Sequence, residues 1–115
     1  MKEGKLNIYG VDISVKEAED LPQEGCFGYS KTVSGEIVIN SKQPESQKEI
    51  TLIHESIHLC WSAMGLDKMT EITEPQINAI ATEFYRLGFK PSEKIDSGKE
   101  KATRKRKIGF KLEGK

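Results

Sequence analysis

The only two histidines of the chain lie four residues apart, in the segment His54-Glu55-Ser56-Ile57-His58. If this segment is helical, the two imidazoles lie about 40° apart around the axis and one turn apart along it, so both can bind one metal ion. Neutral imidazole is a common ligand of Zn²⁺, and the spacing therefore predicts one zinc ion per chain. Glu55 is rotated by about 100° from His54, beside the ion, where it can take a proton from a water molecule that the ion activates.

A catalytic zinc ion needs a third protein ligand and keeps one position open for water. Four downstream side chains carry a suitable atom: Cys60, Asp67, Glu71 and Glu74. Cys60 lies about 200° around the helix from His58, which points it away from the ion and favours a role as a small buried residue. Asp67 and Glu71 lie in a connecting loop and remain alternatives. Glu74 begins a second predicted helix, and this rigid position favours it as the third ligand.

Two supporting roles have candidates in the sequence. Asn78 follows Glu74 by one helical turn, and we expect its side chain to hydrogen-bond the free ring nitrogen of a ligating histidine. A donor for a tetrahedral oxyanion is also needed, and the candidates are Tyr29, Tyr85 and Arg86. The sequence does not choose among these three.

Hydrophobic periodicity predicts the elements that must hold these residues. Apolar residues alternate with polar ones in the first part of the chain, which predicts short strands over 6–8, 11–15 and 27–29. The β-branched run at 36–40 predicts a further strand. Because this run lies just before the metal-binding helix, we expect a sheet edge there to which an extended peptide substrate can add.

Two helices are predicted after the strands. The first spans about 45–64 and ends at Gly65; its apolar stripe is Ile50, Ile53, Ile57 and Trp61. The second begins at Thr73, which forms a capping box with Gln76, and ends at Gly88; its stripe is Ile77, Ile80, Ala81, Phe84 and Leu87. The predicted fold class is therefore α+β, a small antiparallel or mixed sheet of N-terminal strands packed on two helices.

Length and charge predict one folded domain followed by a basic tail. The 115 residues carry 18 Lys or Arg and 18 Asp or Glu, which excludes a uniformly basic nucleic-acid coat protein and an acidic solvating chain. Residues 91–115 alone carry nine basic and four acidic side chains. The predicted boundary is therefore at 90/91, with a tail that is partly disordered or forms a late strand at 108–112. Nucleic-acid binding by this tail is the less favoured alternative to a solvated charge run.

The same composition predicts a cytoplasmic protein that does not enter a membrane. No run approaches the ~18 apolar residues that span a bilayer. The two cysteines lie 34 positions apart and are too few for a disulfide framework, which favours reduced thiols.

Three segments in order, IVIN at 37–40, TLIHESIH at 51–58 and EPQINAIA at 74–81, resemble the ImmA/IrrE group of small zinc metallopeptidases. The resemblance covers about residues 25–88. It implies that residues 1–90 form a minimal zincin-like domain with a gluzincin-like site. His54, His58 and Glu74 would be the zinc ligands, Glu55 the general base, and Asn78 the support of a histidine. Members are often encoded by phages or mobile elements, and some cut repressors or related regulators.

The predicted function is hydrolysis of a peptide bond in a protein substrate, with a regulator as one candidate, by a water that zinc and Glu55 activate. Two alternatives belong to other classes. One is a non-catalytic zinc-binding module, in which the metal stabilises a small core. The other is a basic-tailed adaptor of phage origin.

Overall fold

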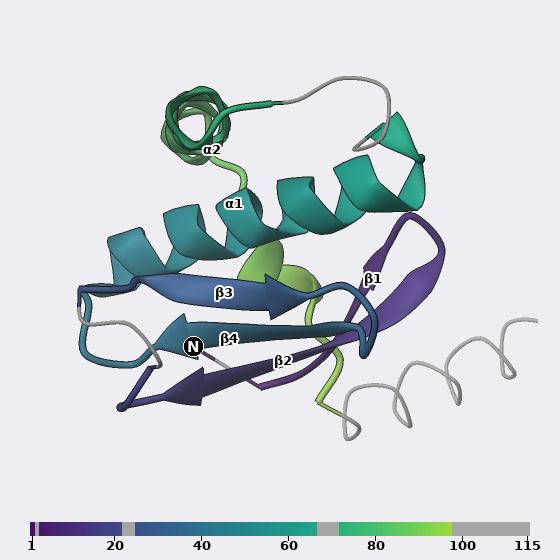
Figure 1. Cartoon of the computed structure of the whole chain (residues 1–115). Helices are drawn as coiled ribbons and strands as arrows, with labels where there is room; N and C mark the ends of the chain where they lie inside the picture. Colours follow the sequence, from purple (N-terminus) through teal and green to yellow (C-terminus); the bar gives the residue numbers. More distant parts are fainter. Residues whose placement is uncertain (2, 22–24, 67–71, 98–115) are drawn as a thin grey trace, which may run out of the picture.

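The computed structural model of this chain describes residues 1, 3–21, 25–66 and 72–97. Four strands precede two helices and a short 3₁₀ helix (Figure 1). Their bounds are β1 Gly4–Ile8, β2 Val11–Ala18, β3 Gly28–Lys31, β4 Glu36–Asn40, α1 Glu45–Ala63, α2 Glu74–Arg86 and η2 Pro91–Lys94. The α+β fold class is thus confirmed. Within the described ranges, no helix is long and apolar enough to cross a membrane.

The four strands form one mixed sheet in the order β1-β2-β4-β3. β2 and β4 are parallel, whereas the β1–β2 and β3–β4 pairs are antiparallel. The prediction of a sheet edge at 36–40 was wrong, because β4 lies between β2 and β3. Its residues Ile37, Val38 and Ile39 are all at most 1% exposed, and such a continuous apolar run is typical of a strand covered on both faces. β3 is the edge strand on this side.

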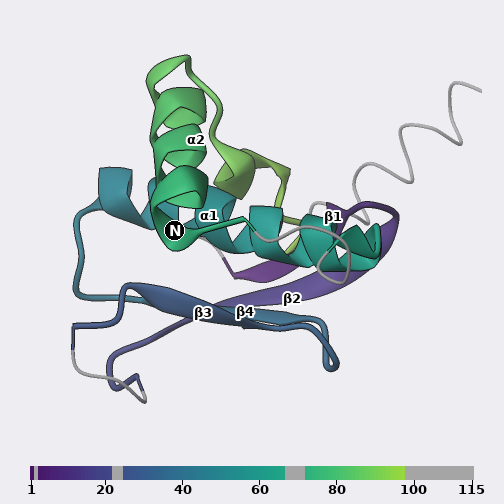
Figure 2. The same ribbon diagram turned by 45° about the horizontal axis from the view of Figure 1, so that its top comes forward.

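Helix α1 lies between the sheet and α2 (Figure 1), and α2 crosses it on the side away from the sheet (Figure 2). The core between α1 and the sheet contains Leu52 and Leu59, which the predicted stripe did not include. Of that stripe, only Ile53 is fully buried, and the other members are half-buried. The predicted stripe assumed that α1 buries a single face. In the structure α1 contacts the sheet on one side and α2 on the other.

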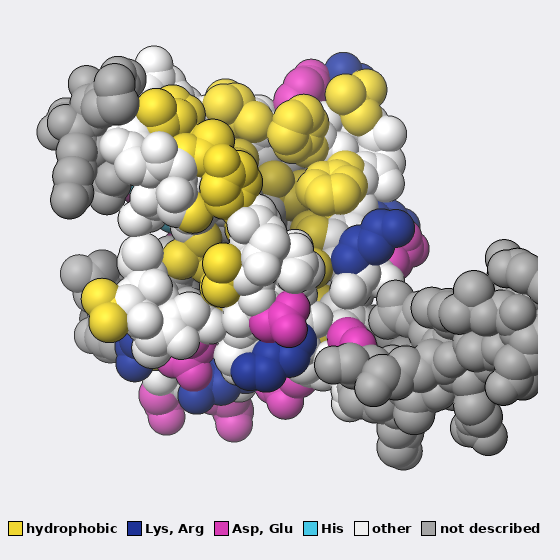
Figure 3. Space-filling view, turned by 90° about the vertical axis from the view of Figure 1, so that its right-hand side faces the viewer, with side chains coloured by type: hydrophobic (Ala, Val, Ile, Leu, Met, Phe, Trp, Pro, Cys, Tyr) yellow, Lys and Arg dark blue, Asp and Glu magenta, His cyan; other side chains and the backbone are white. Residues whose placement is uncertain are grey.

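Only part of the predicted apolar stripe of α2 is covered. Ile77 and Ala81 are fully buried, but the side chains of Ile80, Phe84 and Leu87 are exposed. Figure 3 shows hydrophobic side chains gathered in the upper part of one face of the molecule, above most of its charged side chains.

The ends of the helices follow the predicted signals. Gly65 adopts φ 77° just beyond α1, and Gly88 adopts φ 101° just beyond α2, conformations that favour glycine. Thr73 is the N-cap of α2, and its capping box with Gln76 is complete, since each side chain hydrogen-bonds the backbone N–H of the other residue.

The folded body extends beyond the predicted boundary at 90/91. Ile95 is 1% exposed within the main core, and Lys5 exchanges backbone hydrogen bonds of 2.9 and 2.7 Å with Asp96. Ser92 hydrogen-bonds the Glu49 carboxylate of α1 through both its hydroxyl and its backbone N–H. The boundary was predicted from the change in charge after residue 90. Burial of Ile95 in the core holds the following residues against the body in spite of that charge. The predicted late strand at 108–112 lies outside the described residues.

Substitution of Ile95 by alanine tests this extension. Ile95→Ala should lower the free energy of unfolding by about 2–5 kcal/mol, because it leaves a cavity in the core. Leu87→Ala is the matched control, since Leu87 is 72% exposed; its effect should stay within about 0.5 kcal/mol. Urea denaturation measures both, and equal small effects would show that Ile95 does not belong to the core.

Candidate metal centre

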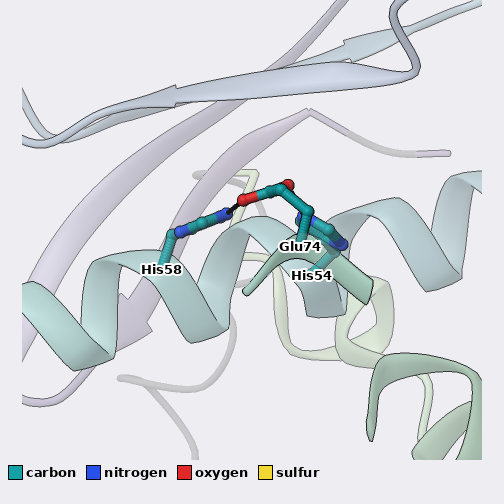
Figure 4. A group of neighbouring side chains, drawn as sticks. All are labelled: His54, His58 and Glu74. Carbon is teal, nitrogen blue, oxygen red and sulfur yellow. Dashed lines mark hydrogen bonds and ion pairs between the residues drawn. The ribbon is translucent and has the colours of Figure 1, made fainter. Parts of the chain in front are cut away.

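The two histidines of α1 face the first residue of α2 (Figure 4). Nε2 of His54 lies 2.8 Å from Oε1 of Glu74, and Nε2 of His58 lies 2.8 Å from Oε2 of the same carboxylate. The two imidazole ring centres are 5.1 Å apart. The Glu74 carboxylate therefore lies between the two rings.

Local sequence explains how each side chain reaches this point. The four-residue spacing places both imidazoles on one side of α1, next to its contact with α2. Glu74 is the first residue of α2, where the capping box of Thr73 fixes the first helical turn. Burial of Ile77 and Ala81, together with the contact between α1 and α2, then sets the position of that turn relative to the histidines.

The three side chains fit a zinc ion. Their nearest ligand atoms all lie within 4.8 Å of one another, close enough for one ion to bind all three. Two imidazole nitrogens and one carboxylate oxygen are a donor set that Zn²⁺ accepts, and three protein ligands leave a fourth position for water. Cys60 is not a member of this cluster. Asp67 and Glu71, the alternatives to Glu74 as third ligand, lie outside the described residues.

The carboxylate of Glu74 has the charge state that a metal requires. Its partial burial acts to raise its pKa, but the hydrogen bond to His54 and the charge of nearby His58 outweigh this effect. The pKa of Glu74 therefore lies below its ordinary value, and the group stays an anion at neutral pH.

Glu55 points from α1 toward the sheet and is only 7% exposed. Burial raises the pKa of its carboxyl above the ordinary value. The hydrogen bond with the Ser30 hydroxyl and the two imidazoles partly oppose this rise, whereas the charge of Glu74 adds to it. A carboxyl group with a raised pKa next to a metal site suits a general base.

Ser30 is a site residue that the sequence did not single out. It lies in edge strand β3, and its hydroxyl donates to the carboxylate of Glu55. Period-two alternation places Gly28 and Ser30 on one face of β3. Ser30 pairs with Ile37 of β4, and the side chain of Ile37 belongs to the core. Paired residues share a face of the sheet, so this face of β3 turns toward α1, which the sequence alone does not reveal.

A groove passes on both sides of the three predicted ligands. A cavity of about 610 Å³ lies on the His58 side and reaches Trp61 and Ile72. A smaller cavity of about 160 Å³ lies on the His54 side and reaches Phe27 and Asn78. Gly28, Glu55 and Glu74 line both cavities.

Asn78 does not make its predicted contact. It lines the smaller cavity together with His54, but it is exposed, and within the described part of the chain no hydrogen bond joins its side chain to either imidazole. The position is one turn beyond Glu74, as predicted, but the side chain stays exposed there.

The three predicted oxyanion donors are not brought to the metal-binding face. Tyr85 and Arg86 lie about 16–18 Å along α2 from Glu74, and Arg86 binds Glu83 at 2.6 Å. Tyr29 borders the larger cavity, but strand alternation directs its ring to the face opposite Ser30. There the Lys31 ammonium lies 5.7 Å from the ring centre.

No protein-family model matches the chain, and comparison with curated proteins and with solved structures gives no significant match. The function is therefore inferred from the geometry of the site.

Removal of Glu74 tests the ligand set. Purified without added metal, the chain should contain about one zinc ion, whereas Glu74→Ala should bind zinc more weakly by more than the ~10- to 100-fold that outer-shell changes cost. Glu83→Ala, an exposed glutamate on the same helix, is the control and should retain the metal. Elemental analysis and zinc titration measure both, and full zinc content in Glu74→Ala would contradict the assignment.

The raised pKa of Glu55 predicts a pH-dependent cost in stability. The folded state of the metal-free protein binds a proton more tightly at this position than the unfolded state. Stability therefore falls as pH rises from the ordinary carboxyl value of ~4.3 through the folded-state pKa. Glu55→Gln removes this cost, so the variant should be more stable than the wild type at neutral pH, and the difference should shrink on acidification.

Chemical denaturation of the metal-free proteins at several pH values measures this difference. Glu83→Gln is the control with the opposite sign, because the hydrogen bond with Arg86 lowers the pKa of Glu83. A Glu55→Gln variant that is less stable than the wild type at neutral pH would contradict the prediction.

Proposed function

We propose that this protein is a zinc-dependent peptidase that hydrolyses a peptide bond in an extended segment of a protein substrate. The observation that carries the proposal is the convergence of His54, His58 and Glu74 beside the buried carboxyl of Glu55. All four side chains border a groove that an edge strand flanks.

Two features favour an enzyme over a non-catalytic zinc-binding module. A structural zinc site closes all four positions with protein ligands, whereas three side chains converge here among the described residues. Such a site also has no use for Glu55, a carboxyl that is buried next to the ligands without being one of them.

The reaction assigns one role to each residue. His54, His58 and Glu74 hold the ion. Zinc, when bound, lowers the pKa of a water molecule and polarises the carbonyl of the bond to be cut. Glu55 takes the proton from the attacking water and returns it to the leaving amine. Ser30 keeps the Glu55 carboxylate in position through its hydrogen bond.

The substrate adds to β3. This strand pairs with β4 on one side only, so its other side offers backbone groups to an extended peptide. The same strand contributes Ser30 and lines both cavities, which places a bound peptide backbone along the groove.

The resemblance to the ImmA/IrrE group supports the same function. On the basis of this resemblance we propose that the protein is cytoplasmic, that it comes from a phage or mobile element, and that its substrate is a regulatory protein. A basic-tailed adaptor remains the alternative, and salt-dependent DNA binding that is lost on deletion of 98–115 would favour it.

Substitution of the general base tests the proposal. Glu55→Gln should retain about one zinc ion and lose turnover of a labelled unfolded protein such as casein by at least about 100-fold. Glu83→Gln is the control and should keep both zinc and activity. Full activity in zinc-loaded Glu55→Gln would exclude the role of Glu55. A zinc-loaded wild type without activity toward any unfolded protein would favour the non-catalytic module.

A further inference from the structure

The groove has two unequal ends, and we propose that they select the residues on the two sides of the cleaved bond. The larger end takes the bulkier side chain, from the residue before the bond, and the smaller end favours a smaller side chain, from the residue after it. This inference rests on the proposed peptidase function and specifies its substrate.

The larger end offers apolar surface for a side chain at two places, among polar neighbours that include Ser30, Thr32, Ser62 and Thr73. Trp61 lies three residues beyond His58, almost one helical turn, and is half-buried in the wall of the ~610 Å³ cavity. Ile72, just before α2, supplies a second apolar surface in the same wall. An aromatic or long aliphatic side chain that enters this space gains contact with an aromatic ring and loses its own exposure to water.

The smaller end has less room. Its volume of about 160 Å³ compares with about 610 Å³ at the larger end, and it is close to the ~150 Å³ of an apolar cavity that one benzene ring fills. One wall is backbone: a Cβ atom at Gly28 would lie 2.8 Å from Cγ2 of Thr51 and 2.8 Å from the carbonyl oxygen of Val38. β3 and α1 thus approach as closely as the absence of a side chain at Gly28 allows, and Phe27 and Asn78 bound the space beside it.

The direction of β3 decides which end receives which residue. The smaller cavity lies at the Phe27 end of the strand, and the larger cavity extends to Thr32 at the other end. An antiparallel partner, the more stable pairing per residue, runs from the Thr32 end to the Phe27 end. The residue before the cleaved bond therefore lies at Trp61, and the residue after it lies near Phe27.

Cleavage of defined peptides tests this selection. Blocked hexapeptides of alanine carry the central pair Phe–Ala, Ala–Phe or Ala–Ala, and mass spectrometry locates the cut made by the zinc-loaded wild type. We expect the Phe–Ala peptide to be cut between these two residues at least about ten-fold faster than Ala–Ala, and Ala–Phe to be cut at its central bond more slowly than Phe–Ala. Trp61→Ala should abolish the preference, Trp61→Phe should retain it, and Phe89→Ala, an exposed aromatic outside the groove, should leave it unchanged.

Fluorescence supplies a readout that does not depend on turnover. Trp61 is the only tryptophan of the chain, so its emission reports the larger end of the groove alone. In Glu55→Gln, the Phe–Ala peptide should change this emission saturably and at a lower concentration than Ala–Ala does. An identical response to both peptides would overturn the inference even if a Trp61 variant failed to fold.

The outcomes separate this inference from the proposed function. Equal cleavage of all three peptides, or faster cleavage of Ala–Phe at its central bond, would overturn the selection and leave the peptidase function in place. A zinc-loaded wild type that cuts neither these peptides nor unfolded casein would overturn both.

Discussion

The structure of the site depends on helix α1 being held from two sides. Leu52 and Leu59 pack against one face of the sheet, and α2 contacts the helix on the side away from the sheet. These two contacts fix the rotation of the helix about its own axis, and the histidines occupy the strip between them. With the rotation fixed, His54 and His58 face the first turn of α2, and Glu55 faces the sheet. Packing on the sheet alone would orient the helix, but it would not bring Glu74 to the two imidazoles.

Burial of the Glu55 carboxyl destabilises the fold, and apolar packing elsewhere in the core compensates for it. The Glu55 side chain is 7% exposed, and its ionised form would be more stable in water. The raised pKa reflects this free-energy cost of burying the charge. The position gives the group a single hydroxyl partner on β3 and places it beside the two imidazoles. Apolar packing at Ile37, Ile39 and Leu52 holds the helix against the sheet regardless of this cost. A site with an exposed glutamate would be more stable and less suited to proton transfer.

Edge strand β3 links the chemistry to the shape of the groove. It is short, it pairs on one side only, and Gly28 lets it approach α1 closely enough for Ser30 to reach Glu55. The same close approach narrows the groove on the His54 side and leaves it wide near Trp61. The residues that position the general base and those that limit the substrate therefore belong to one strand.

The sequence by itself determined the elements and the core of the site, because these depend on local spacing. The four-residue spacing of the histidines, the capping box at Thr73 and the alternation of the strands each act within one element. What depended on contacts between elements was decided by the tertiary structure: the interior place of β4, the two-sided burial of α1, and the inclusion of Ile95 in the core. Strand pairing also decided the roles of Ser30 and Tyr29, since a shift by one residue exchanges the faces of a strand. The position of Asn78 relative to the imidazoles was set by the packing of α2 on α1, which no local pattern encodes.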